Sequence, residues 1–113
     1  MPVHELAITE SMVAAVADTV GPLRVVRVHL QIGALAGVVP DALRFCFEAC
    51  VRDTSLANAS LEIDEVPARG RCKGCGAELA MSSLLDECAC GGMEIEVLAG
   101  QELRIKDVEV EVQ

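Results

Sequence analysis

The 113-residue sequence has almost no aromatic side chains: Phe45 and Phe47 are its two phenylalanines, and tryptophan and tyrosine are absent. The core that such a chain can build is aliphatic and small. Domains with small cores often need a further stabilising element, such as a bound metal ion. The length suits one domain, with or without a small insert.

Basic residues are also scarce. The chain has 9 Lys and Arg against 18 Asp and Glu, which gives a formal net charge of −9. Nucleic-acid binding draws much of its free energy from Lys and Arg on phosphates, and anionic membrane surfaces attract basic segments. The sequence therefore argues against nucleic-acid and membrane partners.

Long apolar runs and a basic leader are missing too. The longest uncharged stretches fall short of the roughly 18 apolar residues that indicate a membrane-spanning helix. The first ten residues hold His4, Glu5 and Glu10 and no Lys or Arg, whereas a secretory signal starts with basic residues. We therefore expect a cytoplasmic protein, in which cysteines stay reduced or bind metal rather than form disulfides.

Hydrophobic periodicity predicts two helices and three strands outside a cysteine-rich stretch. The predicted helices cover residues 5–20 and 40–51, and the predicted strands cover residues 23–32, 61–66 and 103–112. The first helix should turn Ile8, Met12, Ala15, Val16 and Val20 inward. In the last strand the alternation shifts by one residue at Lys106-Asp107, which predicts a bulge or a break there.

These elements predict an α+β fold in which two helices and the strands form two layers. The stretch from residue 68 to residue 100 differs from the rest, because most of the glycines and four of the six cysteines lie in it. We expect it to be an inserted lobe organised by metal. Residues 1–67 and 101–113 would then form the α+β body.

The cysteines of this stretch form two close pairs, Cys72 with Cys75 and Cys88 with Cys90, and each pair is followed by glycine. Two turns that each present two thiolates predict a tetrahedral Zn²⁺ site. Glycine lets each turn adopt a positive φ, so that backbone N–H groups point at sulfur. Arg69, Arg71 and Lys73 would offset the negative charge of the site.

Other interpretations of the cysteines remain open from the residues alone. The same four ligands also suit iron. Two disulfides, or a redox-active pair at Cys72 and Cys75, fit the expected compartment and the surrounding sequence less well. Cys46 and Cys50, four residues apart on the second helix, could form a two-thiol half-site, but buried apolar cysteines are the more common case.

The two histidines differ in their setting. His29 falls on the polar side of an alternating strand, and we expect it to be solvated. His4 lies close to the start of the chain with Glu5 beside it. A single histidine there would by itself be no evidence of a site.

Four segments together resemble the HypA/HybF family, the nickel metallochaperones of [NiFe]-hydrogenase maturation. They are His4-Glu5-Leu6-Ala7-Ile8, IGALAGVVPDALRFCFEAC from Ile32 to Cys50, the two cysteine pairs, and GQELRIKDVEVE from Gly100 to Glu111. They follow one another in order over nearly the whole chain. Two features depart from the family pattern: Pro2-Val3 stand between Met1 and the histidine, and the second cysteine pair is one residue shorter.

The resemblance implies two helices on a small mixed β-sheet with an inserted zinc-ribbon lobe. It implies Ni²⁺ as cargo at the N-terminal His4 and Glu5, and structural Zn²⁺ on Cys72, Cys75, Cys88 and Cys90. It also implies a maturation GTPase and the hydrogenase large subunit precursor as partners, and in some bacteria urease maturation proteins.

The start of the chain predicts how nickel would be held. Met1 is generally removed before a small residue such as Pro2, which would make His4 the third residue. The Pro2 amine, two deprotonated backbone amides and the His4 imidazole could then form a planar four-nitrogen chelate, which suits Ni²⁺ and Cu²⁺. If Met1 is kept, Glu5 or another group would have to help.

Three functions of different classes follow from this reading. The leading hypothesis is a carrier without enzymatic activity that hands Ni²⁺ to a protein partner. The alternatives are a zinc-ribbon interaction module without nickel delivery, and a thiol-redox protein. Nickel titration separates the first from the second, and thiol accessibility in the metal-bound protein separates the third.

Overall fold

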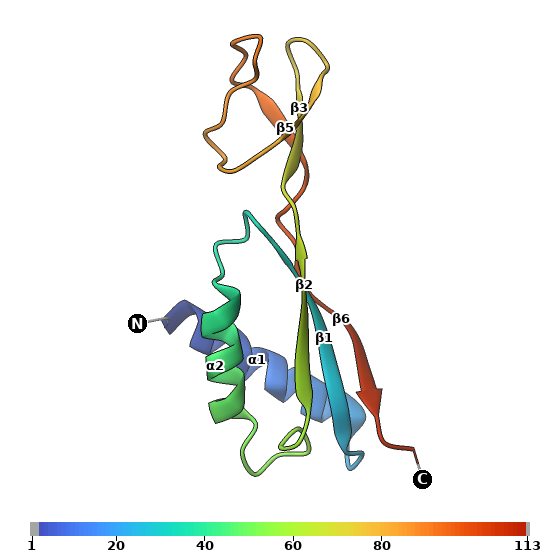
Figure 1. The fold of residues 1–113 in the computed structure, drawn as a ribbon. Helices are drawn as coiled ribbons and strands as arrows, with labels where there is room; N and C mark the ends of the chain where they lie inside the picture. The colour runs from blue at the N-terminus through green and yellow to red at the C-terminus, as the bar shows by residue number, and fades with distance from the viewer. Residues whose placement is uncertain (1–2, 113) are drawn as a thin grey trace. The chain divides into compact units, whose positions relative to one another are not determined.

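The computed structural model describes residues 3–112, which form two helices and six short strands (Figure 1). The elements are, in chain order, α1 (Val3–Val20), β1 (Val25–Gly33), α2 (Pro40–Cys50), β2 (Ser60–Val66), β3 (Arg69–Cys72), β4 (Glu78–Ala80), β5 (Ile95–Ala99) and β6 (Leu103–Val110). The strands form two three-stranded sheets, ordered β2-β1-β6 and β4-β3-β5. The predicted α+β class is confirmed. No helix within residues 3–112 is long and apolar enough to cross a membrane.

The chain divides into two compact units. The helical unit contains the chain up to Leu30, Val38–Asp64, and the chain from Ile105 onward. The cysteine unit contains Gln31–Gly37 and Glu65–Arg104. Both helices therefore belong to the first unit, and all four clustered cysteines belong to the second.

Side-chain pairs across the first sheet reveal the directions of its strands. Arg27 of the central strand β1 pairs with Glu62 on β2 and Glu109 on β6. His29, the next residue of β1 on the same face, pairs with Asp64 on β2 and Asp107 on β6. Residue numbers rise together on β1 and β2 and run oppositely on β1 and β6. The sheet is therefore mixed, as predicted, and α2 lies on the crossover that a parallel pair requires.

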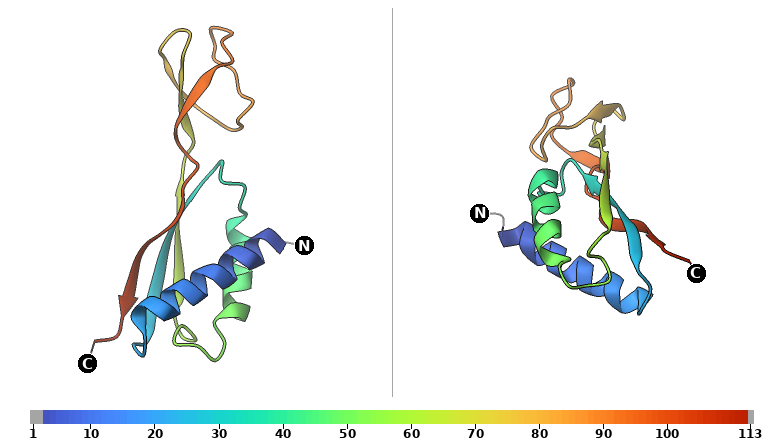
Figure 2. Two further views of the ribbon diagram at one scale, coloured as in Figure 1. Left: turned by 180° about the vertical axis from the view of Figure 1, so that it is seen from behind. Right: turned by 60° about the horizontal axis from the view of Figure 1, so that its bottom comes forward.

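Both helices cover the same face of this sheet (Figure 2), and the core of the helical unit lies between them. The apolar side chains with less than a tenth of their surface exposed include Met12, Val13 and Val16 of α1, Val25, Val28 and Leu30 of β1, and Leu43, Cys46 and Phe47 of α2. Cys46 is a free thiol in this core, whereas Cys50 is only partly buried. The prediction of a buried apolar cysteine is confirmed for Cys46.

The buried stripe of α1 differs in one respect from the predicted one. Ala15 was expected to face inward but is exposed, while Val13 is buried in its place. Thr9 is fully buried within the stripe. Its hydroxyl donates to the carbonyl oxygen of Glu5 at 2.7 Å. A threonine whose hydroxyl is satisfied by its own helix can lie in an apolar core, and periodicity of apolar residues alone does not detect it.

Side-chain hydrogen bonds between β1 and β6 are unevenly spaced along the two strands. Arg104 hydrogen-bonds Gln31, and Asp107 pairs with His29. Two residues separate the partners on β1, but three separate them on β6. An extra residue in one strand of an antiparallel pair is a β-bulge. This unequal spacing fits the bulge expected from the phase shift at Lys106-Asp107, which stays a prediction, whereas β6 runs without a break from Leu103 to Val110.

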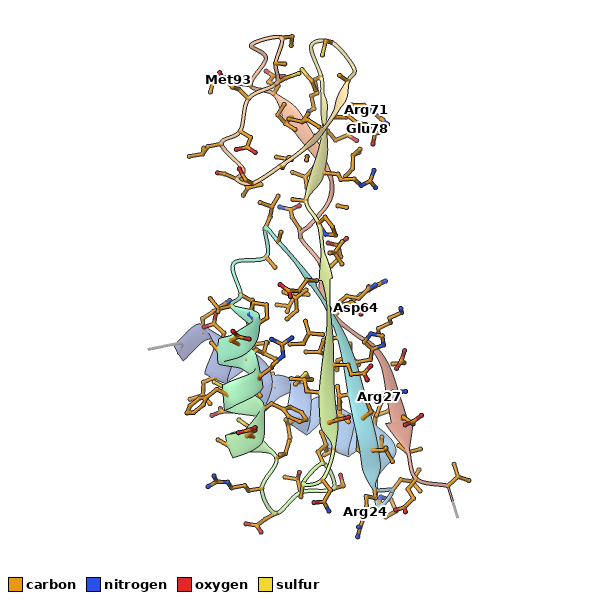
Figure 3. All side chains as sticks on the ribbon, in the orientation of Figure 1. Arg24, Arg27, Asp64, Arg71, Glu78 and Met93 are labelled. Atoms are coloured by element: carbon orange, nitrogen blue, oxygen red, sulfur yellow. The ribbon has the colours of Figure 1, made fainter. Side chains whose placement is uncertain are left out.

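His29 is bridged rather than solvated, which corrects the prediction for this residue. Its Nε2 lies 2.9 Å from Asp64 Oδ2 and its Nδ1 lies 3.3 Å from Asp107 Oδ2, and its side chain is only 18% exposed. Lys106 Nζ also lies 3.7 Å from the same Asp64 oxygen. Asp64 and the neighbouring Arg27 lie on the side of the sheet away from the helices (Figure 3). Strand alternation gave the correct face, but the acidic partners come from strands distant in sequence.

This bridge predicts a pH-dependent contribution to stability. The hydrogen bond to Asp64 is the main cause that raises the pKa of His29 above its ordinary value of 6.5, with Asp107 adding to it. Stability from a raised pKa is complete below 6.5 and is lost as the pH rises through the folded-state pKa. The free energy of unfolding, measured in urea, should therefore decline in the wild type as the pH rises from about 6 to about 9, roughly the range in which a histidine titrates. The same decline should be absent in His29→Gln; equal slopes in the two proteins would contradict the assignment.

Candidate metal centre

Two tight turns of the cysteine unit present the four cysteines. Cys72 ends β3, and its N–H donates to the carbonyl of Ala77 at 2.9 Å, which closes the first turn. In the second turn the N–H of Cys88 donates to the carbonyl of Gly92 at 2.8 Å. The predicted positive φ occurs after both pairs, at 78° for Gly76 and 88° for Gly91.

The four sulfur atoms of Cys72, Cys75, Cys88 and Cys90 all lie within 4.8 Å of one another. The Sγ atoms of Cys72 and Cys90 are 3.6 Å apart, as are those of Cys75 and Cys88. A disulfide would require about 2.05 Å. Zn–S bonds of about 2.3 Å in a tetrahedron place sulfurs about 3.8 Å apart. The arrangement thus fits a tetrahedral metal ion, and the shorter C-x-C pair does not prevent it.

Two of the cluster thiols, those of Cys72 and Cys90, have pKa values shifted in opposite directions. Backbone N–H groups, that of Cys75 foremost and that of Gly74 after it, lower the pKa of Cys72 to about 7. The N–H of Gly92 acts in the same direction on Cys90, but hydrogen bonds with the sulfurs of Cys72, Cys75 and Cys88, together with burial, raise its pKa to about 11. The thiolate of Cys72 is therefore the easier of these two to form, and a second negative charge at Cys90 is opposed. A divalent ion removes this opposition, because thiolates are its ligands.

Gly92 leaves room for two of the sulfur atoms, a role that was not predicted from the sequence. A Cβ atom at this position would lie 2.9 Å from the sulfur of Cys72 and 3.3 Å from that of Cys90. Its N–H lies 3.4 Å from the Cys90 sulfur and donates to it. A side chain here would displace ligands, so the second glycine of the Gly91-Gly92 pair was the signal that could have been used.

The basic residues expected to offset the charge of the cluster are partly engaged elsewhere. Arg69 forms an ion pair with Glu78 at 3.1 Å. Arg71 stands opposite Glu78 in the antiparallel pairing of β3 with β4, and Figure 3 shows the two side chains next to each other. Cross-strand pairing, which the sequence did not reveal, brings both arginines near Glu78 and pairs Arg69 with its carboxylate.

The candidate nickel residues lie at the start of α1, in the helical unit. His4 is exposed. Glu5 is 6% exposed, and its Oε2 accepts a hydrogen bond from the N–H of Val39 at 3.0 Å. That hydrogen bond is the main cause that lowers the pKa of Glu5 below its ordinary value. Pro2, the predicted source of the amine ligand, and Met1 lie outside the described residues.

The structure therefore brings together one of the two predicted ligand sets. Within residues 3–112, the four cysteines are the one group of three or more Cys, His, Asp or Glu side chains close enough to hold an ion. All six cysteines are free thiols. No disulfide supports the alternative reading of the pairs.

Comparison with known proteins agrees with the geometry. The sequence model of one family, described as "HypA: Hydrogenase/urease nickel incorporation, metallochaperone, hypA", matches residues 3–110. The hydrogenase maturation factor HypA of Geotalea uraniireducens (strain Rf4) is 54% identical over 109 residues, which cover 96% of this chain and 99% of that protein. The HypA of Nostoc sp. (strain PCC 7120 / SAG 25.82 / UTEX 2576) is 44% identical over 108 residues, 96% of each chain.

The chain belongs to the HypA family. HypA proteins are metallochaperones and maturation factors, so a member acts with other components of hydrogenase maturation. The resemblance found in the sequence is confirmed, and with it the role of a nickel metallochaperone in hydrogenase maturation.

Solved HypA structures share the fold. A solution structure of a HypA protein superposes with a TM-score of 0.68 at 20% identity and covers 100% of both chains. The solution structure of the Ni metallochaperone HypA from Helicobacter pylori gives a TM-score of 0.63 at 18% identity, over 96% of this chain and 98% of that one. At this identity the likeness establishes the HypA architecture, with two helices and small sheets, and no residue roles.

Proposed function

We propose that this HypA-family chain binds Ni²⁺ at its N-terminus through His4 and delivers it to the hydrogenase large subunit precursor, without catalysing a reaction. The observation that carries the proposal is the match to a nickel-incorporation family over residues 3–110. The exposed position of His4 at the start of α1 supports it. Three amino-terminal nitrogens, with the Pro2 amine first among them, complete the proposed planar ligand set.

The proposed metal of the cysteine cluster is a structural Zn²⁺ ion. Four thiolates close a tetrahedral shell and leave no open coordination position, which is the pattern of structural rather than catalytic zinc. Cys72 and Cys88 are buried and Cys75 and Cys90 exposed. In this assignment the zinc-ribbon lobe of residues 68–100 depends on the ion for its folding, while residues 1–67 and 101–113 form the nickel-binding body.

The proposed partners are the maturation GTPase and the large subunit precursor, together with urease maturation proteins in hosts that make urease. The net charge of −9 opposes binding to nucleic acid and to anionic membranes. Free thiols at all six cysteines suit a reducing compartment. We place the protein in the cytoplasm on these grounds.

A titration of the intact protein with Ni²⁺ tests the proposal against its competitors. A carrier binds one tightly held Ni²⁺ in addition to the metal of the cysteine cluster. The competing zinc-ribbon interaction module, which the exposed side chains of Leu84, Leu85 and Met93 would favour, binds none. A redox protein would instead show reactive Cys72 and Cys75 thiols while the cluster metal is bound.

Binding to the GTPase is expected to use the helical unit near α1. Glu10 and Asp18 are exposed on α1, so Glu10→Lys and Asp18→Lys should each slow association a few-fold if the partner's face is basic. Salt should weaken the wild-type complex for the same reason. Stopped-flow or surface-binding kinetics at two ionic strengths would measure both effects.

The matched control is Glu96→Lys, which makes the same charge change at an exposed position of β5 in the cysteine unit. It should leave the association rate close to that of the wild type. Normal binding by the two α1 variants, combined with lost binding when the lobe of residues 68–100 is deleted, would place the interface on the lobe instead.

A further inference from the structure

Glu5 is a buried acidic residue next to the proposed nickel ligand, yet its carboxylate already has a partner. It is one of two buried polar or charged residues of the described chain, with 6% of its surface exposed. Its Oε2 accepts the N–H of Val39 at 3.0 Å. A nickel ligand drawn from this side chain would have to leave that hydrogen bond and its buried position.

The partner of Glu5 is Val39, the residue directly before α2. Val39 is the N-cap of this helix, with an extended backbone (φ −89°, ψ 114°), and its own side chain makes no capping hydrogen bond. Pro40 follows and has no N–H. A carboxylate at this position complements the positive end of the helix. In a capping box the side chain of the third helical residue accepts the N-cap N–H; that residue here is Ala42, and Glu5 supplies the acceptor from α1 instead.

The same residue marks a boundary within α1. The carbonyl of Glu5 accepts the hydroxyl of the fully buried Thr9 at 2.7 Å, so both ends of Glu5 are held. Val3 and His4 precede it in the first turn of α1, whose N–H groups have no partners within the helix. A planar chelate needs amide nitrogens in one plane, whereas a helix directs them along its axis. Loading nickel would unwind the turn up to His4 and stop at Glu5.

We propose that Glu5 is a positioning residue and not a nickel ligand: its carboxylate ties the start of α1 to the start of α2 and holds the nickel-binding turn in place. The part of this inference that concerns nickel affinity rests on the proposed function. The part that concerns the hydrogen bond between Glu5 and Val39 does not, because that bond can be measured without nickel.

Two substitutions of Glu5 separate a positioning role from ligation. Glu5→Gln keeps an oxygen acceptor for the Val39 N–H, whereas Glu5→Ala removes it. We expect Glu5→Gln to keep the wild-type visible spectrum of the nickel complex and an affinity within a few-fold of wild type. Glu5→Ala should lose about tenfold or more, the size of effect that a hydrogen bond to a charged group carries. Glu10→Ala, on the exposed face of the same helix, is the control for lost charge and should bind normally.

A third variant removes the donor of the Glu5–Val39 hydrogen bond instead of the acceptor. Val39→Pro removes the donor while leaving Glu5 intact, and the lost valine side chain is 57% exposed. It should reproduce the nickel affinity of Glu5→Ala, and the double variant should be no worse than either single one, because both remove the same bond. Loss of the planar spectrum in Glu5→Gln together with normal affinity in Val39→Pro would show that Glu5 is a ligand and would overturn the proposal.

Measurements without nickel distinguish failure of this inference from failure of the nickel function. Amide exchange at Val39 should be faster in Glu5→Ala than in Glu5→Gln in the nickel-free protein. Unchanged exchange at Val39 in Glu5→Ala would overturn the positioning role, whatever the nickel results. Normal nickel binding by His4→Ala would overturn the nickel site while leaving the Glu5–Val39 result standing.

Discussion

Cys75→Ser is expected to release the cluster metal and unfold the cysteine-bearing lobe while the helical unit stays folded. Cys75 is exposed, so the substitution removes one of the four candidate metal ligands and little packing. Structural zinc supplies on the order of 10 kcal/mol of folding free energy in small zinc domains. The strands β3 and β4 have four and three residues, and sheets this short are marginal without such a contribution.

Metal analysis and amide spectra would measure this result. The wild type should contain one zinc per chain, and Cys75→Ser should contain none. Amide signals from about residue 70 to residue 98 should collapse to disordered positions, while those of α1 and α2 persist. Cys50→Ser, which changes a partly buried thiol outside the cluster, is the matched control and should keep its zinc. A wild-type protein with no zinc or iron and four freely titrating thiols in the lobe would refute the site.

His4→Ala is expected to abolish tight nickel binding. The imidazole is one of four proposed nitrogen ligands, so its loss should exceed the roughly 10–100-fold cost of removing an outer partner of a metal site. His29→Gln is the matched control, because it removes the other histidine of the chain. His29 is bridged by Asp64 and Asp107, and its variant should bind nickel with wild-type affinity.

Blocking the amino terminus tests the rest of the ligand set. If the intact mass shows that Met1 is removed, acetylation of the Pro2 amine should weaken nickel binding as strongly as His4→Ala does. The visible spectrum should change from that of a planar nitrogen complex. Because the amides lose protons on binding, the affinity should fall as the pH is lowered. Equal nickel affinity in acetylated and free protein would show that the planar chelate is wrong, and His4 would then need to be tested as a ligand without the amine.

Local features of the chain were readable from its sequence because each depends on neighbours only a few residues away. The helix from Pro40 follows from a proline at its first turn and one acid, Asp41, at its positive end. The positive φ of Gly76 and Gly91 follows from tight turns after cysteine pairs. The continuous last strand, β6, follows from apolar alternation on either side of Lys106-Asp107, and the phase shift there predicts a bulge, since a shift of one residue exchanges the two faces of a strand. Each of the two cysteine pairs was readable for the same reason.

Tertiary structure decided which distant residues meet. The bridge of His29 by Asp64 and Asp107 depends on β2 and β6 flanking β1, and those partners lie 35 and 78 positions away. The contact of Gly92 with the Cys72 sulfur depends on the folding of one turn onto the other. The hydrogen bond from the Val39 N–H to Glu5 joins residues 34 positions apart. Its acceptor is the Glu5 carboxylate, which the family resemblance had suggested as a nickel ligand. Hydrophobic patterning specifies faces and periods, but the pairing of polar groups across elements is set by register and packing, which emerge only when the whole chain folds.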